Sequence, residues 1–149
     1  MSISEKTYKV LKEAGWYPGR KIDITETVKY LEDKGFEVLD SAKKFMEEFG
    51  ELNLKVERQF KDGSIAISKH TTCIKYVVGC GSACDFFLDE VKKEKVMLIG
   101  ALSNFGTDLY ISESGRVYKM IGWVGDNVWE AWDNIINEKN TIIWDKFKE

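Results

Sequence analysis

Three segments with helical periodicity precede the segments that alternate like strands. Apolar side chains recur three and four positions apart in residues 2–15, 23–35 and 41–50, and each segment ends at a glycine. The first two begin with Ser2 and Asp23, each followed three positions later by Glu, which is the spacing of a capping box. We therefore expect three helices ahead of the strands.

Alternating apolar and polar residues dominate the rest of the chain. Strands are expected over residues 52–59, 63–69, 72–79 and 95–103, and on both sides of the turn 113–116. A short helix is expected over residues 82–94, and the clearest helix over 126–140, where Asp126 is the expected cap. Trp132 falls on the buried face of that last helix. The tail 141–149 is expected to dock as a strand or a helical turn.

The length of 149 residues fits a single domain, which we place over residues 1–149. No apolar run approaches the ~20 residues of a membrane span, and the first ten residues lack the apolar core of a signal peptide. The chain has three cysteines, and their spacing is not that of a disulfide-stabilised domain. This is typical of a protein in a reducing compartment. We therefore expect a cytoplasmic protein with no membrane contact.

Charge is distributed unevenly along the chain. Residues 1–75 carry 14 basic and 13 acidic side chains, whereas residues 76–149 carry 8 and 12, so the second half has a net charge of −4. A nucleic-acid-binding protein normally has a basic face, and nothing in this pattern indicates one. The acidic half instead favours a basic protein partner, mainly through faster association.

Residues 14–24 hold the only proline of the chain, between two glycines. The segment lies between two expected helices, so it can be a structural joint. In that interpretation Gly15 ends a helix, Pro18 stiffens the turn and Trp16 packs beneath it. Arg20 would then pair with a carboxylate or with the carbonyl groups of a helix end. The alternative is a ligand-binding loop, and the joint is the simpler interpretation.

Residues with catalytic or metal-binding chemistry are few. His70, the single histidine, and Cys73 lie three positions apart in a strand-like stretch and would occupy opposite faces. Cys80 and Cys84 form a C-x₃-C pair, whereas zinc ribbons use C-x₂-C. A four-ligand metal site can be drawn from these residues, but buried free thiols and a surface histidine are simpler. We therefore expect no catalysis, no metal and no cofactor.

Tryptophan is frequent, with five residues among 149. Core packing is the simpler interpretation for each, above all for Trp132. Trp123 lies in an expected loop, and Trp129 lies at the edge of the buried face of the last helix. Either also fits the exposed anchor of a protein interface beside acidic groups.

The order of several short motifs resembles the third immunity-protein subfamily of the SUKH superfamily, over residues 7–136. The motifs are Gly15-Trp16 with Arg20, Phe49-Gly50 with Leu52, and Gly115-Arg116-Val117-Tyr118 followed by Glu130-Ala131. Members often carry a proline before the glycine that matches Gly100, where this chain has Ile99.

This resemblance implies an α+β fold in which helices pack on a mostly antiparallel sheet. It implies an intracellular bacterial protein that binds and neutralises a cognate toxin domain of a polymorphic toxin system, without catalysis of its own. Such toxins are often nucleases or other nucleic-acid-targeting domains. Alternatives are an adaptor of the same fold unrelated to toxins, and a small-molecule binder or enzyme that uses the cysteine region. A monomer is the favoured state.

Toxin contact is expected through the acidic half of the chain. The elements expected to contribute are the helix 85–94, the hairpin 108–118 and the loop that holds Trp123. The candidate charges are Asp85, Asp89, Asp108, Glu113 and Asp126, and the candidate anchors are Trp123 and Trp129. The motif residues Gly15, Trp16, Pro18, Arg20, Gly50, Gly115 and Trp132 are expected to be structural.

Overall fold

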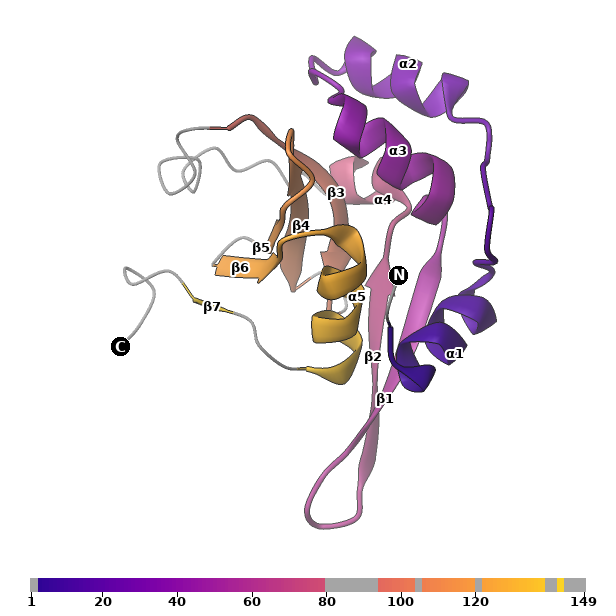
Figure 1. Ribbon diagram of the computed structural model, residues 1–149, viewed down its shortest axis with the longest axis vertical. Helices are drawn as coiled ribbons and strands as arrows, with labels where there is room; N and C mark the ends of the chain where they lie inside the picture. The colour runs from indigo at the N-terminus through magenta and orange to yellow at the C-terminus, as the bar shows by residue number, and fades with distance from the viewer. Residues whose placement is uncertain (1–2, 80–93, 104–105, 120–121, 139–141, 144–149) are drawn as a thin grey trace.

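The computed structural model describes residues 3–79, 94–103, 106–119, 122–138 and 142–143. The helices are α1 Glu5–Ala14, α2 Thr25–Asp33, α3 Asp40–Phe49, α4 Ile74–Gly79 and α5 Val128–Asn137. The strands are β1 Asn53–Gln59, β2 Ile65–Thr71, β3 Val96–Leu102, β4 Thr107–Ser112, β5 Val117–Lys119, β6 Gly122–Gly125 and β7 Ile142–Ile143. Helices pack on a curled antiparallel sheet, so the expected α+β fold is confirmed (Figure 1).

The described strands pair in chain order from β1 to β7, and every pairing is antiparallel. Seven residue pairs join β1 to β2, but β2 meets β3 only at Thr71 and Ala101. The β1–β2 hairpin can therefore diverge from the sheet, and its far end projects from the body in Figure 1. The turn expected at Asp62-Gly63 is confirmed, and so is the strand alternative for the tail, since β7 pairs with β6.

Three helix starts lie downstream of the caps that we expected at Ser2, Asp23 and Asp126, and α2 follows Ile24, which makes no side-chain cap. A side chain caps the other two helices. Ser4 is the cap of α1, and its side chain accepts a hydrogen bond from the Thr7 amide. Asn127 rather than Asp126 caps α5, and its side chain accepts from the Glu130 amide at 2.9 Å. In both cases the capping residue has extended backbone, as an N-cap requires.

Residues 72–79 do not form the strand that their β-branched composition predicts. The Thr72 hydroxyl donates to the Phe49 carbonyl, and the Cys73 amide donates to the Thr71 hydroxyl, so the chain turns away at the end of β2. Helix α4 follows and buries Ile74 and Val77, which share one helix face. The helix expected over residues 82–94 lies outside the described residues, apart from Glu94.

Strand β6 occupies a stretch that the sequence indicated to be a loop. It pairs with β5 on one side and β7 on the other, so its position depends on partners distant in sequence. A register shift in the β3–β4 pairing falls between Leu98 and Gly100. Ile99, where members of the family that the sequence resembles often carry proline, lies at this bulge and is fully buried.

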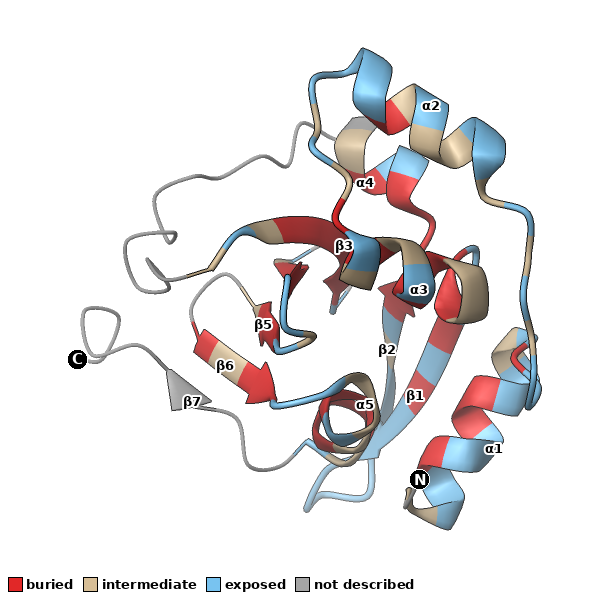
Figure 2. Ribbon diagram, turned by 45° about the horizontal axis from the view of Figure 1, so that its top comes forward, coloured by how far each residue is buried: buried red, intermediate tan, exposed pale blue. Residues whose placement is uncertain are grey.

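An aromatic cluster connects α1, α3 and α5 in the core. Trp132 is 1 % exposed and lies 6.0 Å from Phe45 and 5.6 Å from Phe49, measured between ring centroids. Trp16 stacks on Phe49 at 6.2 Å. Figure 2 shows that these helices turn their buried side toward the sheet and their exposed side outward. The buried stripe expected for the last helix is therefore confirmed.

The loop at residues 14–24 has the contacts of a structural joint. Gly15 ends α1 with a left-handed backbone (φ 114°), and its amide donates to the Lys12 carbonyl. The Trp16 indole is buried and donates to Glu48 Oε2 at 3.1 Å. Arg20 donates to the Glu48 carbonyl at 2.7 Å, a helix-end partner of the expected kind, whereas Pro18 is exposed.

Candidate functional site

A groove of about 430 Å³ lies between α3, the β4–β5 turn and the first turn of α5. We call it the acidic groove. Its lining residues are Asp40, Ser41, Lys44, Phe45, Glu48, Phe49, Ile111, Glu113, Ser114, Gly115, Asn127, Val128 and Trp129. Residues from two distant parts of the sequence, 40–49 and 111–129, therefore form one concave surface.

The floor of the acidic groove is apolar and rigidly supported. Phe45, Phe49 and Ile111 belong to the buried core. Trp129 is half-buried, and it meets the edges of Phe49 at 5.2 Å and Trp16 at 5.7 Å. A fixed aromatic side chain with one free side is a favourable anchor for a protein partner, because little rotamer freedom remains to be lost on binding.

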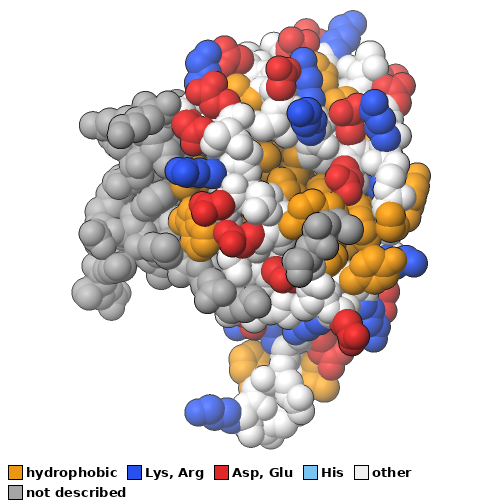
Figure 3. All heavy atoms as spheres, in the orientation of Figure 1, with side chains coloured by type: hydrophobic (Ala, Val, Ile, Leu, Met, Phe, Trp, Pro, Cys, Tyr) orange, Lys and Arg blue, Asp and Glu red, His pale blue; other side chains and the backbone are white. Residues whose placement is uncertain are grey.

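The rim of the acidic groove carries more negative than positive charge. Among the described lining residues, Asp40, Glu48 and Glu113 are acidic and Lys44 alone is basic. Figure 3 shows hydrophobic side chains at the centre of this side of the molecule, with acidic side chains around them. An apolar centre with a charged rim is the usual organisation of a protein interface.

Hydrogen bonds fix the β4–β5 turn against α3. The Ser41 hydroxyl donates to the Ser112 carbonyl at 2.7 Å, and the Ser112 amide donates to the Arg116 carbonyl at 2.8 Å. The Ser114 amide donates to Glu94, and hydrogen bonds from this turn hold the pKa of Glu94 below its usual value. Gly115 lies in the turn itself. The groove wall is therefore preorganised.

Three of the expected partner residues lie at or beside the acidic groove. Glu113 and Trp129 line it. Asp126 is exposed and precedes the lining residue Asn127. The Trp123 indole donates to Asp126 at 3.0 Å, but Trp123 lies on β6 and does not line the groove.

The other expected charges differ in their positions. Asp108 is 8 % exposed on β4, a strand buried on both faces, so it is not the surface charge that we expected. The Tyr110 hydroxyl lies 3.4 Å from its Oδ2. Asp85 and Asp89 lie outside the described residues. The groove adds Asp40 and Glu48, which were not among the partner residues expected from the sequence.

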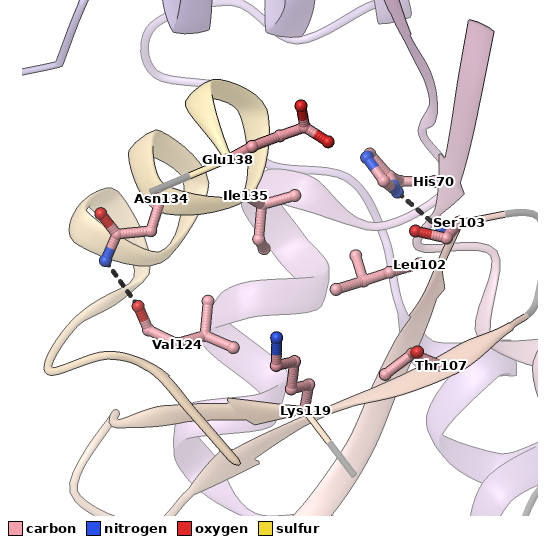
Figure 4. Close-up of a pocket in the computed structure, with 9 residues that line it drawn as sticks. All are labelled: His70, Leu102, Ser103, Thr107, Lys119, Val124, Asn134, Ile135 and Glu138. Carbon is pink, nitrogen blue, oxygen red and sulfur yellow. Dashed lines mark hydrogen bonds between the residues drawn. The ribbon is translucent and has the colours of Figure 1, made fainter. Parts of the chain in front are cut away.

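A second, smaller cavity of about 200 Å³ lies at the C-terminal half of α5, whereas the acidic groove lies at its first turn. We call it the His70 cavity. Its lining residues are His70, Leu102, Ser103, Thr107, Lys119, Val124, Asn134, Ile135 and Glu138 (Figure 4). They come from β2, β3, β4, β5, β6 and α5, and from the residues directly after β3 and α5.

His70 is not the surface histidine that the sequence indicated. It is 7 % exposed on β2, and its Nδ1 accepts a hydrogen bond from the Ser103 amide at 2.9 Å. Burial, with a smaller effect of the Arg58 charge, lowers the pKa of His70 to about 4. The imidazole is therefore neutral at physiological pH and carries its proton on Nε2.

No cluster of three or more potential metal-ligating side chains is present within the described residues. Cys73 is a buried free thiol, and Cys80 and Cys84 lie outside those residues. No described helix is long and apolar enough to cross a membrane.

Comparison with protein-family models gives a match to the SUKH-3 immunity protein family over residues 3–138. Searches of curated proteins and of solved structures gave no match. The family match spans the joint, the acidic groove and the His70 cavity, and it covers nearly the whole chain. The chain therefore belongs to the SUKH-3 immunity protein family.

Proposed function

We propose that this protein neutralises a cognate toxin domain by binding it inside the cell that makes the toxin. The observation that carries this proposal is the family match over residues 3–138. Protection is by occlusion and requires no catalysis by the immunity protein. The protein acts as a monomer in the cytoplasm.

The acidic groove is the proposed centre of the toxin interface. Its apolar floor and its exposed Trp129 edge provide an anchor site, and its rim charges attract a basic surface. A standard interface buries about 1,600 Å² in total, so neighbouring elements must also contribute. Trp123 and Asp126 extend the surface beyond the groove.

The toxin that best fits this surface acts on nucleic acid. A nuclease binds its substrate in a basic cleft, because the phosphate backbone is negatively charged. Acidic side chains around an apolar anchor can occupy such a cleft in place of the substrate. The excess of acids along the groove rim and the net charge of −4 for residues 76–149 support this class.

Growth protection tests the proposal. The candidate toxin domain is sought among the neighbouring genes and expressed from an inducible promoter in a bacterial host, with or without the immunity protein. We expect wild-type protein to restore growth and to co-purify with the toxin domain in a one-to-one complex. Growth arrest despite folded, abundant immunity protein, with no complex recovered, would reject the assignment of this toxin as its partner.

A matched pair of variants tests the location of the interface. The groove variant combines Asp40→Lys, Glu113→Lys and Asp126→Lys. The control variant combines Glu13→Lys, Glu32→Lys and Asp33→Lys, three exposed acids on α1 and α2 that make the same change in net charge. Only the groove variant is expected to lose protection.

A further inference from the structure

We propose that two copies of this chain associate through the free edge of β2, where Ile65 of each copy packs against Ile67 of the other. The two β2 strands pair antiparallel about a two-fold axis, so the hairpins of the two copies form one four-stranded sheet. This surface lies outside the acidic groove, and the pairing does not depend on the toxin assignment.

The outer edge of β2 is uncovered because β3 turns away from it. Within the described residues the two strands pair at Thr71 and Ala101 alone. Two positions after Ala101, Ser103 has left-handed backbone (φ 53°), and its amide donates to the His70 side chain at 2.9 Å instead of extending the ladder. Residues 65–69 therefore pair with β1 only, and this end of the hairpin projects from the body in Figure 1.

The hydrogen bonds of the hairpin show which backbone groups of β2 face the free edge. The Phe60 amide donates to the Ser64 carbonyl at 2.9 Å, so even-numbered residues of β2 exchange hydrogen bonds with β1 in this register. The amides and carbonyls of Ile65, Ile67 and Lys69 therefore point away from β1, and none has a backbone partner among the described residues. An unpaired edge of this kind is a template for another strand.

Two large apolar side chains on this edge are exposed. Ile65 is 59 % exposed and Ile67 is 54 % exposed. They lie on the same face of β2, because they are two positions apart. Their neighbours across the hairpin are Gln59 and Glu57, which are polar and exposed, so β1 does not cover them. A strand added at the free edge would cover apolar surface as well as satisfy backbone groups.

One register makes the edge complementary to itself. When Ala66 faces Ala66 of the second copy, Ile65 of each copy lies opposite Ile67 of the other, and the outward amides and carbonyls meet. A centre at Ile67 would place Ile65 opposite Lys69. A centre at Ile65 would place Ile67 opposite Gly63. An edge that matches itself under two-fold rotation gives a closed dimer, so a second copy is the partner that fits.

The paired stretch is short, so the association is weak. A standard interface buries about 1,600 Å² in total, and weak, transient contacts bury less than about 1,200 Å². Residues 65–69 of two copies belong to the weaker class, for which we expect a Kd of about 100 µM. At low micromolar concentration the protein is therefore a single chain, as proposed for toxin binding. The acidic groove also stays open in the pair, because its described lining residues all lie outside residues 53–71.

Sedimentation equilibrium of the full-length protein, between about 10 µM and about 1 mM, measures the association. Ile67→Lys places a charge at the centre of the paired edge and should weaken the dimer at least about tenfold. Tyr76→Lys is the matched control, because Tyr76 is 72 % exposed on α4 and the change in net charge is the same. The control should associate like wild type. Circular dichroism reports whether each variant is folded.

A cysteine variant tests the register. Ala66→Cys places two thiols across the two-fold axis, where facing Cα atoms are about 4.5 Å apart and a disulfide can form. Ser64→Cys is the control, because the same register keeps its two copies about 14 Å apart. Under mild oxidation we expect Ala66→Cys to form covalent dimer at least about tenfold faster than Ser64→Cys. The native cysteines are the same in both variants.

Four results would overturn the proposal. The first is a monomer mass for wild type up to about 1 mM. The second is a folded Ile67→Lys variant that associates as strongly as wild type. The third is equal cross-linking of Ala66→Cys and Ser64→Cys. The fourth is monomeric wild type whose Ile65 and Ile67 amide resonances shift only when the toxin domain is added, which would assign the edge to the toxin. If Ile67→Lys fails to fold, Ile65→Lys and the cysteine pair decide the question.

Discussion

Arg20 donates a hydrogen bond from its guanidinium to the backbone carbonyl of Glu48 at 2.7 Å, across 28 positions of sequence. The same Glu48 accepts from the Trp16 indole through its side chain. Glu48, near the end of α3, therefore accepts hydrogen bonds from two residues, Trp16 and Arg20, of the joint between α1 and α2. The joint and the acidic groove share this residue, because Glu48 also lines the groove.

Replacing Arg20 by Ala should lower stability more than it weakens partner binding. The variant loses a charge-assisted hydrogen bond, which costs about 1.5–3 kcal/mol, and the melting temperature should fall by roughly 3–10 °C. Differential scanning calorimetry and titration with the toxin domain measure the two effects. A normal melting temperature with abolished binding would make the loop a binding element.

Truncation of Trp132 should be among the most damaging changes in the core. Trp132→Ala is expected to cost about 3–5 kcal/mol, because the indole is 1 % exposed within the aromatic cluster. Its Nε1 has no hydrogen-bond partner among the described residues, so Trp132→Phe removes an unsatisfied donor along with some volume. Chemical denaturation should therefore give Trp132→Phe a much higher free energy of unfolding than Trp132→Ala. Equal losses for the two variants would contradict this ranking and mean that a phenyl ring does not fill the space left by the indole.

Gly50, at the end of α3, has no space for a side chain. Its φ of −65° suits any residue, but a Cβ there would lie 2.5 Å from the Met46 carbonyl oxygen. Gly50→Ala should therefore destabilise the fold by about 1–3 kcal/mol through overpacking. A urea midpoint equal to that of wild type would mean that the chain relaxes there without cost.

Stability should fall between about pH 6.5 and pH 4 because of His70. Its pKa is about 4 in the folded protein and 6.5 when unperturbed, so the unfolded chain binds the proton more tightly. The contribution of the neutral His70 imidazole to the free energy of unfolding is complete above pH 6.5, decreases as the pH falls and is lost near pH 4. Its full size is on the order of 3 kcal/mol.

The charged neighbours of His70 within the part of the chain that the structure describes are Arg58, Glu138 and Lys119, and they remain in a His70→Gln variant. Comparing the pH dependence of unfolding in wild type and His70→Gln isolates the histidine. The variant should be less stable at neutral pH and should show a flatter profile between pH 6.5 and pH 4. Parallel profiles would show that His70 titrates normally.

The helical parts of the fold were the more predictable from sequence. Phe45, Phe49 and Trp132 recur at helical spacing, and this pattern alone identifies their buried faces. Residues 72–79 were predicted as a strand because β-branched side chains favour one. Hydrogen bonds from Thr72 and Cys73 end β2 before that stretch, and α4 forms instead.

The candidate sites were less predictable, because they depend on contacts between distant elements. Nothing local shows that α3 lies beside the β4–β5 turn, so Asp40 could not be assigned to the groove with Glu113. The sequence around Asp108 does not distinguish it from a surface charge, yet it is 8 % exposed on β4, an interior strand of the sheet whose two faces are both buried. His70 is buried for the same kind of reason, since the Ser103 amide comes from another strand end.

The association rate between this protein and its toxin domain tests the central account most directly. It is measured by stopped flow at low and high salt for wild type, the groove variant (Asp40, Glu113 and Asp126 to Lys) and the control variant (Glu13, Glu32 and Asp33 to Lys). All three proteins must first show the same fold by circular dichroism. We expect the groove variant to associate at least about tenfold more slowly than the control at low salt, and the difference to shrink at high salt. Equal low-salt rates for the groove and control variants would contradict the acidic groove as the toxin-binding surface.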